Sequence, residues 1–330
     1  MSLDLVHRPR RNRKSPVIRA FTRETVIGPE HFISPLFIHD APGDVTIASM
    51  PGCKRMGASS LYAEVEASLT VGVRAFALFP AIPEAQKTRG AEEAWNPDGL
   101  IPRTLVELKR RFPEAMLVTD VALDPYNSDG HDGLVSDDGR ILNDPTVKAL
   151  CAQALSQARA GADIIAPSDM MDGRVGALRA ALDREGYTDV SILAYTAKYA
   201  SAFYGPFRDA LDSAPKADDK KTYQMDPANV REALRELELD EAEGADIVMV
   251  KPAGAYLDVI AALRSATALP VAAYQVSGEY AMLHAAAQNG WLDLEKTALE
   301  SLLGIRRAGA DVIFTYFARQ AATWLRDHPL

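Results

Sequence analysis

Eight short apolar runs, separated by helix-like segments, are the feature that most limits how this chain can fold. We expect one strand in each run, at residues 32–38, 74–79, 115–123, 163–168, 191–198, 246–251, 270–277 and 311–318. Most of the segments between them are alanine- and leucine-rich and amphipathic, among them residues 146–162, 229–245, 256–268 and 294–310. Strands that alternate with helices pair in parallel through right-handed crossovers. Eight such units predict a closed (β/α)8 TIM barrel rather than an open doubly wound sheet.

A three-residue sequence that occurs three times supports this repeating strand–helix arrangement. A Gly-Ala-Asp triplet joins the end of a helical segment to the next strand at residues 161–163, 244–246 and 309–311. Glycine at the end of a helix supplies the left-handed stop. No Walker loop or dinucleotide glycine fingerprint follows any strand, so we expect no organic cofactor. The length of 330 residues fits one barrel domain, which we assign to residues 17–330.

The basic run HRPRRNRKSP lies within residues 1–16 and has no hydrophobic periodicity. Such a run cannot bury enough apolar area to fold alone, so we predict an extended N-terminal arm that is either mobile or docked elsewhere. It also lacks the apolar region of a signal peptide. The rest of the chain brings the formal charge to −9, which gives no general electrostatic support for nucleic-acid binding.

Two cysteines, Cys53 and Cys151, lie far apart and form neither a metal nor a redox spacing. This usage fits a reducing compartment without a disulfide framework. No apolar run approaches the length of a membrane span. We therefore predict a cytoplasmic protein without a membrane partner.

The stretch ADIVMVKP, residues 245–252, reads as a buried parallel strand that ends in Lys251. Desolvation lowers the pKa of a lysine towards that of a neutral amine that attacks carbonyl groups. A strand-end lysine that extends its ammonium into solvent is the alternative interpretation. Lys198 ends the preceding strand at the same edge, and neighbouring strands lie about 4.8 Å apart. Two ammonium groups that close lower each other's proton affinity, so we predict a Schiff-base role for at least one of the lysines.

An aspartate-rich loop follows the third predicted strand. It brings together Asp120, Asp124, Asp129, His131 and Asp132, more ionisable groups than a turn requires. Such groups can bind a hard cation such as Mg²⁺ or K⁺, or receive a substrate ammonium. The loop has no thiolates, which disfavours a zinc site.

The long polar segment 199–224 follows Lys198 directly. A loop of this length in a compact domain is commonly an active-site lid, and the alternative is a solvated charged loop. Its cations Arg208, Lys220 and Lys221 can fold over a carboxylate.

The chain resembles the porphobilinogen synthase (δ-aminolevulinic acid dehydratase) family from the basic run to the C-terminus. The resemblance rests on the stretches YTAKYASAFYGPFRDA, KTYQMDPAN, ADIVMVKPAGAYLD, YQVSGEYAM and AGADVIFTYFA. It implies a barrel with an N-terminal arm that contacts other subunits, usually in a homo-octamer. It also implies the condensation of two 5-aminolevulinate molecules to porphobilinogen with loss of two waters, an early step of tetrapyrrole and heme biosynthesis.

The resemblance also implies roles for single residues. Lys251 would form a Schiff base with the substrate molecule that supplies the propionate side chain, and Lys198 would hold the one that supplies the acetate and aminomethyl groups. Ser277 and Tyr316 would grip the first carboxylate, and Arg208, Lys220 and Gln224 the second. The pocket would be lined by Phe207, Tyr195 and Tyr274, with Asp120 and Ser168 near the amino group of the second substrate.

The chain departs from zinc-using relatives, which carry three cysteines where it has Ala122, Asp124 and Asp132. The resemblance is therefore to the aspartate-rich branch, and it implies no catalytic zinc. K⁺ or Na⁺ near Asp124 and Asp132 is one expectation, and an allosteric Mg²⁺ reached through water by Glu236 is the other. A solvated helix carboxylate is the alternative for Glu236. Lys220 stands where many relatives have arginine, which keeps the charge but loses the two-pronged geometry.

Two other functions remain open at this point. A class I aldolase also uses a strand lysine of this barrel, but it predicts a phosphate-binding glycine loop where the chain has VSGEY and FARQ. A non-catalytic barrel that serves as an oligomeric scaffold has no reason to place two lysines beside an aspartate cluster.

Overall fold

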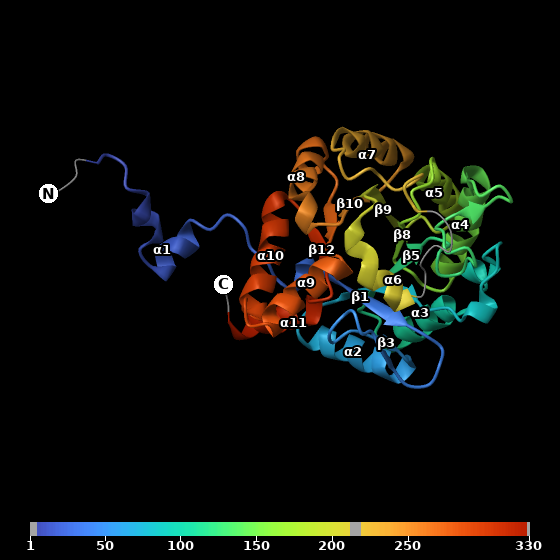
Figure 1. The fold of residues 1–330 in the computed structure, drawn as a ribbon, viewed down its shortest axis with the longest axis horizontal. Coiled ribbons are helices and arrows are strands. Elements are labelled where there is room, and N and C mark those ends of the chain that lie inside the picture. Colours follow the sequence, from blue (N-terminus) through green and yellow to red (C-terminus); the bar gives the residue numbers. More distant parts are fainter. Residues whose placement is uncertain (1–4, 212–218, 329–330) are drawn as a thin grey trace.

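Eight parallel strands close into a barrel in the computed structural model, which describes residues 5–211 and 219–328 (Figure 1). The strands are β1 (Phe32–Ile38), β4 (Ala75–Pro80), β5 (Met116–Val121), β8 (Ile164–Pro167), β9 (Ser191–Lys198), β10 (Ile247–Lys251), β11 (Val271–Tyr274) and β12 (Val312–Phe314). The barrel closes because β12 pairs in parallel with β1, Phe32 lying opposite Ile313. The predicted (β/α)8 barrel is confirmed.

A ring of helices surrounds the strands (Figure 1). Its members are α2 (Ala58–Thr70), α3 (Leu100–Arg111), α4 (Asn143–Arg159), α5 (Arg174–Arg184), α7 (Arg231–Glu243), α8 (Leu257–Ala266), α10 (Leu294–Ala308) and α11 (Ala318–Asp327). Helix α3 shows why these segments fold on the sheet. Its apolar residues Ile101, Leu105 and Leu108 recur at helical spacing and are buried. Its basic residues at 109–111 lie in the last turn, where they favour the negative end of the helix dipole.

Shorter elements occupy the loops. The short strands are β2 (Val45–Thr46), β3 (Lys54–Met56), β6 (Leu134–Val135) and β7 (Ile141–Leu142), and β3 extends the sheet by pairing with β1. The 3-10 turns are η1 (Pro9–Arg13), η2 (Pro29–His31), η3 (Glu84–Gln86), η4 (Glu92–Trp95), η5 (Ala202–Tyr204) and η6 (Gly254–Tyr256). Helices α6 (Gly205–Leu211) and α9 (Ser277–Gln288) follow β9 and β11 at the carboxyl end of the barrel.

The last two barrel strands end earlier than predicted. β11 stops at Tyr274 because α9 begins at Ser277, and β12 stops at Phe314 because the chain turns into α11. Phe317 and Ala318 are still buried, so the apolar run continues from strand into helix without a break in the pattern. Apolar character alone therefore overestimates the lengths of these two strands.

The Gly-Ala-Asp triplets do more than stop helices. Gly161, Gly244 and Gly309 have φ of 103°, 97° and 123°, the left-handed region that favours glycine. The aspartate after each of them accepts a hydrogen bond from a backbone N–H on the neighbouring strand. The pairs are Asp163 with Leu117 (2.7 Å), Asp246 with Ile192 (2.7 Å) and Asp311 with Val271 (3.0 Å). The three triplets thus fasten adjacent strands together at the amino end of the barrel.

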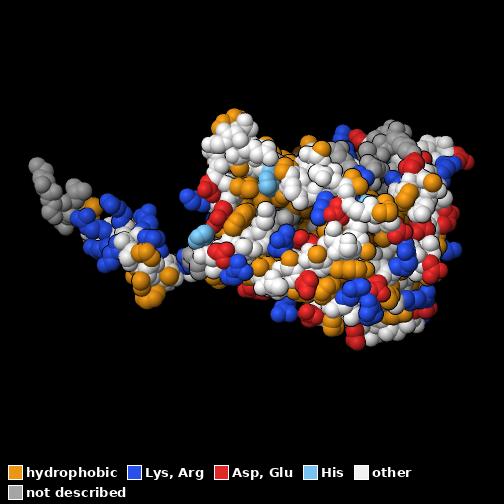
Figure 2. Space-filling view, turned by 90° about the horizontal axis from the view of Figure 1, so that it is seen from below, with side chains coloured by type: hydrophobic (Ala, Val, Ile, Leu, Met, Phe, Trp, Pro, Cys, Tyr) orange, Lys and Arg blue, Asp and Glu red, His pale blue; other side chains and the backbone are white. Residues whose placement is uncertain are grey.

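The N-terminal segment runs away from the barrel and contains α1 (Pro16–Phe21), which Ser15 caps through a hydrogen bond from Ile18 N (Figure 1). Val17 and Phe21 of this helix are 64% and 80% exposed. Figure 2 shows basic side chains crowded on the same segment. Among the described residues, none of the helices combines the length and the apolar character needed to cross a membrane.

Candidate active site

Two lysines stand side by side at the carboxyl end of the barrel. Lys198 of β9 and Lys251 of β10 are register partners, and each is only 6% exposed. The ammonium of Lys251 lies over aromatic rings, 4.4 Å from the centre of Tyr274 and 5.1 Å from the centres of Tyr195 and Phe207. These ring faces favour a charged ammonium. Burial outweighs them and, with the neighbouring Lys198, lowers the pKa of Lys251 to about 7.

Lys198 has polar surroundings instead. Its ammonium donates a hydrogen bond to the carbonyl oxygen of Ser168 and lies 3.7 Å from Asp132 Oδ2. These partners stabilise the charged form. Lys198 is thus held by polar partners, whereas Lys251 is prepared to lose its proton near neutral pH.

Three aspartates face the lysines, and the pKa values of their carboxyl groups differ: Asp124 and Asp132 are buried, and Asp120 is half-buried. Burial, together with the nearby Asp124, raises the pKa of Asp120 to about 6. Burial also raises the pKa of Asp124, against the pull of Lys220. For Asp132 the positive charges of Lys198 and Lys220 outweigh burial and lower the pKa to about 2. Asp132 is therefore a fixed anion, whereas Asp120 can accept or release a proton near physiological pH.

Lys220 reaches into this group from the predicted lid. Its ammonium donates to Asp124 Oδ2 at 3.3 Å and to Asp132 Oδ1 at 3.2 Å. The space that remains has a volume of about 30 Å³, room for roughly one water molecule. Its lining consists of Phe79, Asp120, Asp124, Asp132, Ser168, Lys198, Tyr204, Phe207, Arg208, Lys220, Gln224 and Lys251. Residues 212–218 of the lid lie outside the described residues.

The remaining residues of the predicted pocket lie among the aromatic side chains next to Lys251. The hydroxyl groups of Tyr274 and Tyr316 are 3.1 Å apart, and Tyr316 stacks on Phe37 with ring centres 5.7 Å apart. Ser277 Oγ accepts a hydrogen bond from Phe207 N at 2.9 Å. Tyr195 is buried in the same aromatic wall.

The structure does not bring every sequence-predicted residue together. Asp129 forms an ion pair with Arg89 at 3.6 Å and does not line the cavity that Asp120, Asp124 and Asp132 share. His131 approaches the hydroxyl of Tyr223 at 3.1 Å and lines a separate hollow. Glu236 of α7 lines that second hollow together with Asp172 and Glu232. Lys221 is exposed and forms an ion pair with Asp219 at 2.9 Å.

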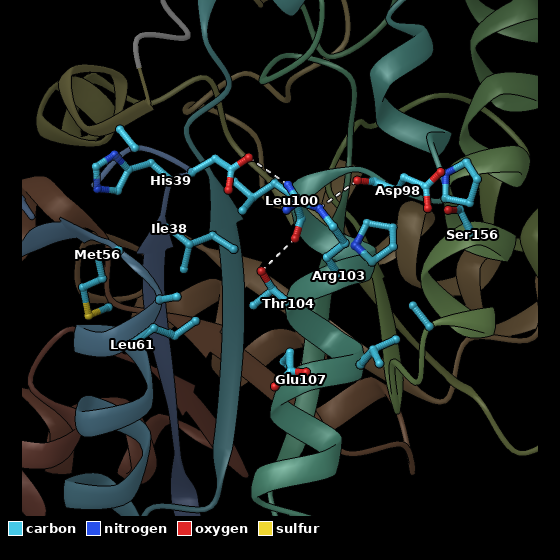
Figure 3. A pocket seen from close by; sticks show the side chains of 18 of the residues that line it. Ile38, His39, Met56, Leu61, Asp98, Leu100, Arg103, Thr104, Glu107 and Ser156 are labelled. Carbon is cyan, nitrogen blue, oxygen red and sulfur yellow. Dashed lines mark hydrogen bonds and ion pairs between the residues drawn. The ribbon is translucent and has the colours of Figure 1, made fainter. Parts of the chain in front are cut away.

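A larger hollow, of about 1120 Å³, lies on the outside of the barrel (Figure 3). Figure 3 shows Ile38, Met56 and Leu61 on one side of it and Leu100 and Arg103 of α3 on the other. It contains neither lysine and none of the three aspartates. Its size alone therefore does not make it the reaction site.

Sequence reasoning missed three residues of the site. Phe79 and Tyr204 line the small cavity, and Glu279 is buried in α9, two residues after Ser277. Phe79 lies near the carboxyl end of its strand, the position where the other site residues were sought, so that signal was present. Tyr204 stands within the stretch YTAKYASAFYGPFRDA. Glu279 stands within the stretch YQVSGEYAM, at a helical position that by itself suggests only a cap.

Two relatives cover nearly the whole chain. "Delta-aminolevulinic acid dehydratase, chloroplastic" of Physcomitrium patens is 63% identical over 319 residues, 96% of this chain and 74% of that protein. "Delta-aminolevulinic acid dehydratase 1, chloroplastic" of Arabidopsis thaliana is 60% identical over 324 residues, 98% of this chain and 75% of that protein. These plastid names contradict the prediction of a cytoplasmic protein. The prediction was wrong because a reducing compartment and a lack of apolar spans do not distinguish cytosol from plastid.

The solved structures and the family comparison agree with these relatives. A crystal structure of delta-aminolevulinic acid dehydratase (porphobilinogen synthase) from Toxoplasma gondii ME49, in complex with the reaction product porphobilinogen, matches with a TM-score of 0.98. It is 54% identical and covers 99% of this chain and 93% of that chain. A sequence model of the family described as Delta-aminolevulinic acid dehydratase matches residues 6–324. The resemblance seen in the sequence is confirmed, and the chain belongs to the delta-aminolevulinic acid dehydratase family of lyases.

Proposed function

We propose that this chain condenses two molecules of 5-aminolevulinate to porphobilinogen through its two buried lysines. The observation that carries the proposal is the register pairing of Lys198 with Lys251 at the carboxyl end of the barrel. The pKa of about 7 for Lys251 supplies an uncharged amine at neutral pH. The family match and the relatives support the same reaction.

Lys251 captures the first substrate molecule in this scheme. Its neutral amine adds to the ketone carbon, and the carbonyl oxygen leaves as water, which gives an iminium. The iminium withdraws electrons, so the carbon that was the ketone carbon becomes an electrophile for the second substrate molecule. The nonpolar rings of Tyr274, Tyr195 and Phe207 keep water away from this intermediate.

Lys198 holds the second molecule by an iminium of the same kind, and loss of a proton from the adjacent carbon makes an enamine nucleophile. Asp120 lies near both lysines, and its pKa of about 6 suits a group that takes up the proton released from carbon. The enamine carbon forms a C–C bond to the carbon held by Lys251, and the amino group of the first molecule forms a C–N bond to the carbon held by Lys198. Each lysine then leaves as a free amine, and the two ketone oxygens have left as the two waters. Holding both substrates in one cavity replaces a bimolecular encounter by a reaction between neighbours.

The two carboxylates are gripped at opposite ends of the site. Ser277 and Tyr316 hold the carboxylate of the first molecule, and Arg208, Lys220 and Gln224 hold that of the second. Lys220 now donates to Asp124 and Asp132, so it must exchange these partners for the substrate carboxylate. Because ligand pockets typically have volumes of about 300–1,000 Å³, the cavity of about 30 Å³ must open to admit substrate.

The residues present suit one of the two predicted metal sites better than the other. Lys220 already places a positive charge between Asp124 and Asp132, so K⁺ or Na⁺ does not fit there in this arrangement, and we derive no step through such an ion. Glu236 suits Mg²⁺ better. Burial raises its pKa, Arg174 opposes this, and Asp240, Asp172 and Glu232 add to it, so a nearby cation would relieve the repulsion.

The described residues contain no group of three or more His, Cys, Asp or Glu side chains that could hold a metal by themselves. Water would therefore complete the coordination of Mg²⁺ at Glu236. We propose that the chain belongs to the aspartate-rich branch without catalytic zinc, and that Mg²⁺ acts through assembly. Chelator should then lower activity and native mass together, and Mg²⁺ should restore both without Zn²⁺.

Self-association is the remaining part of the proposal. The described part of the segment before the barrel, which includes residues 5–16 of the predicted arm at residues 1–16, exposes both basic and apolar side chains (Figure 2). We propose that it contacts neighbouring subunits in a homo-octamer.

Borohydride trapping tests the reaction. Wild-type enzyme is incubated with 5-aminolevulinate, reduced with borohydride and mapped by peptide mass spectrometry, while a colorimetric assay measures porphobilinogen. We expect a substrate adduct on Lys251. Lys198→Met should still capture one substrate but make no product. A wild-type peptide map without a Lys251 adduct would overturn the proposal.

A further inference from the structure

We propose that Glu279 is a positioning residue that ties the loop after Lys251 to the start of α9, where Ser277 lies. The inference rests on the proposed function and adds a residue to it. Glu279 is only 7% exposed, although glutamate is almost never fully buried without a partner. It lies outside the group of charged residues around the lysines, so its burial requires a separate explanation.

The carboxylate of Glu279 bridges two loops. Oε2 accepts a hydrogen bond from Val276 N at 2.7 Å, at the start of its own helix. Oε1 accepts one from Gly254 N at 2.6 Å, in η6 just after β10. Ala253 N also donates to it and lowers its pKa, as the other two N–H groups do, but burial dominates and raises the pKa to about 7.

The loop after β10 is shaped to fit this carboxylate. A Cβ atom added at Gly254 would lie 2.4 Å from Glu279 Oε1. Real Cβ atoms do not approach so closely, so any side chain at 254 would displace the carboxylate or the loop. Ordinary helix capping explains only the bond to Val276, because a glutamate at the third helical position commonly accepts from the residue before the helix. The bond to Gly254 leaves the helix and reaches η6, in the loop that follows β10.

The two clamped loops hold opposite ends of one substrate molecule. Lys251 would capture the ketone, and Ser277 would grip the carboxylate of the same molecule. The backbone oxygen of Lys251 is fixed from the other side by Tyr199 N at 3.0 Å and by the Tyr204 hydroxyl at 3.2 Å. Glu279 therefore sets the spacing between the attacking amine and the carboxylate grip. A shift of about 1 Å in such a spacing can cost roughly a hundredfold in rate.

Glu279→Gln tests the clamp with little change in size, because an amide nitrogen cannot accept a hydrogen bond. We expect the rate of borohydride-trapped capture of 5-aminolevulinate on Lys251 to fall by about 10- to 100-fold. Gly254→Ala disturbs the same contact from the loop after β10 and should slow capture in the same way. This variant also tests the role of Glu279 if Glu279→Gln fails to fold.

Asp293→Asn is the matched control. Asp293 caps α10 by accepting from Lys296 N at 2.9 Å and does not line the cavity, so its variant makes the same carboxylate-to-amide change at a helix start without touching the clamp. Capture should stay at the wild-type rate in this variant. The inference is overturned if Glu279→Gln and Gly254→Ala capture substrate at the wild-type rate, or if Asp293→Asn slows capture equally. Absence of the Lys251 adduct in wild-type enzyme would instead refute the proposed function.

Discussion

Lys251 and Lys198 end neighbouring strands in the same register, yet their ammonium groups have opposite surroundings. Aromatic rings surround the ammonium of Lys251, whereas a carbonyl oxygen and a carboxylate hold that of Lys198. Burial in the first setting disfavours charge, and polar partners in the second stabilise it. Two identical side chains on neighbouring strands therefore stand in different surroundings, and Lys251 is the one that burial prepares to act as a nucleophilic amine.

The pH dependence of capture follows from this difference. With a pKa of about 7, Lys251 is half neutral at pH 7 and only about one tenth neutral at pH 6. The rate of borohydride-trapped adduct formation should rise through this range and level off above pH 8. Lys198→Met removes a positive neighbour that lowers the pKa of Lys251, so its midpoint should move to higher pH. A midpoint that is unchanged or lower in this variant would show that the two lysines do not interact.

The sequence predicted some site residues and could not predict others, for physical reasons. Lys198 and Lys251 were predictable because the end of a buried strand is visible as the end of an apolar run. The contact of Lys220 with Asp124 was not, since 96 residues separate them and no local pattern encodes the pairing. Glu279 resembled an ordinary helix-capping residue, because its second partner lies in the separate loop that follows β10.

At the scale of elements, the barrel is fastened by repeated aspartates at its amino end. The backbone N–H groups of Leu117, Ile192 and Val271 each donate to an aspartate on the next strand of the chain. Strand existence was predictable from apolar runs, and β1 and β9 match their predicted ranges. The aspartate contacts were not predicted, because the triplet pattern shows where helices stop but not where a side chain points.

Removing one of these aspartates should weaken the barrel by a definite amount. Asp246→Ala leaves the N–H of Ile192 without its carboxylate, which should cost about 1–3 kcal/mol in the free energy of unfolding, measured by urea titration. Asp163→Ala should cost more, because Asp163 also pairs with Lys109 at 2.6 Å. Asp246→Asn keeps an oxygen acceptor and should lose less than Asp246→Ala. Equal losses for the two variants at 246 would mean that charge, and not the hydrogen bond, provides the stability.

At the scale of the whole molecule, the N-terminal segment has a surface that a lone barrel does not explain. Val6, Val17, Phe21 and Val26 are 82%, 64%, 80% and 66% exposed along one short stretch of chain. Basic residues lie between them, whereas the chain as a whole carries a net charge of −9. Large apolar side chains gathered on a protruding segment commonly mark a surface that contacts another protein. A second acidic copy of this chain would match both the apolar and the basic character.

Phe21→Asp tests this interpretation through native mass. Burying a phenylalanine contributes roughly 1.5–3 kcal/mol, and a buried aspartate without a partner adds a further penalty, so each subunit contact should weaken. We expect native mass spectrometry and light scattering to show smaller assemblies, while the urea midpoint of the barrel changes little because Phe21 is 80% exposed in the single chain. Phe21→Leu keeps an apolar side chain and should preserve the wild-type mass. If Phe21→Asp also preserves it, α1 does not contribute to assembly, and the exposed apolar residues of the segment have another role.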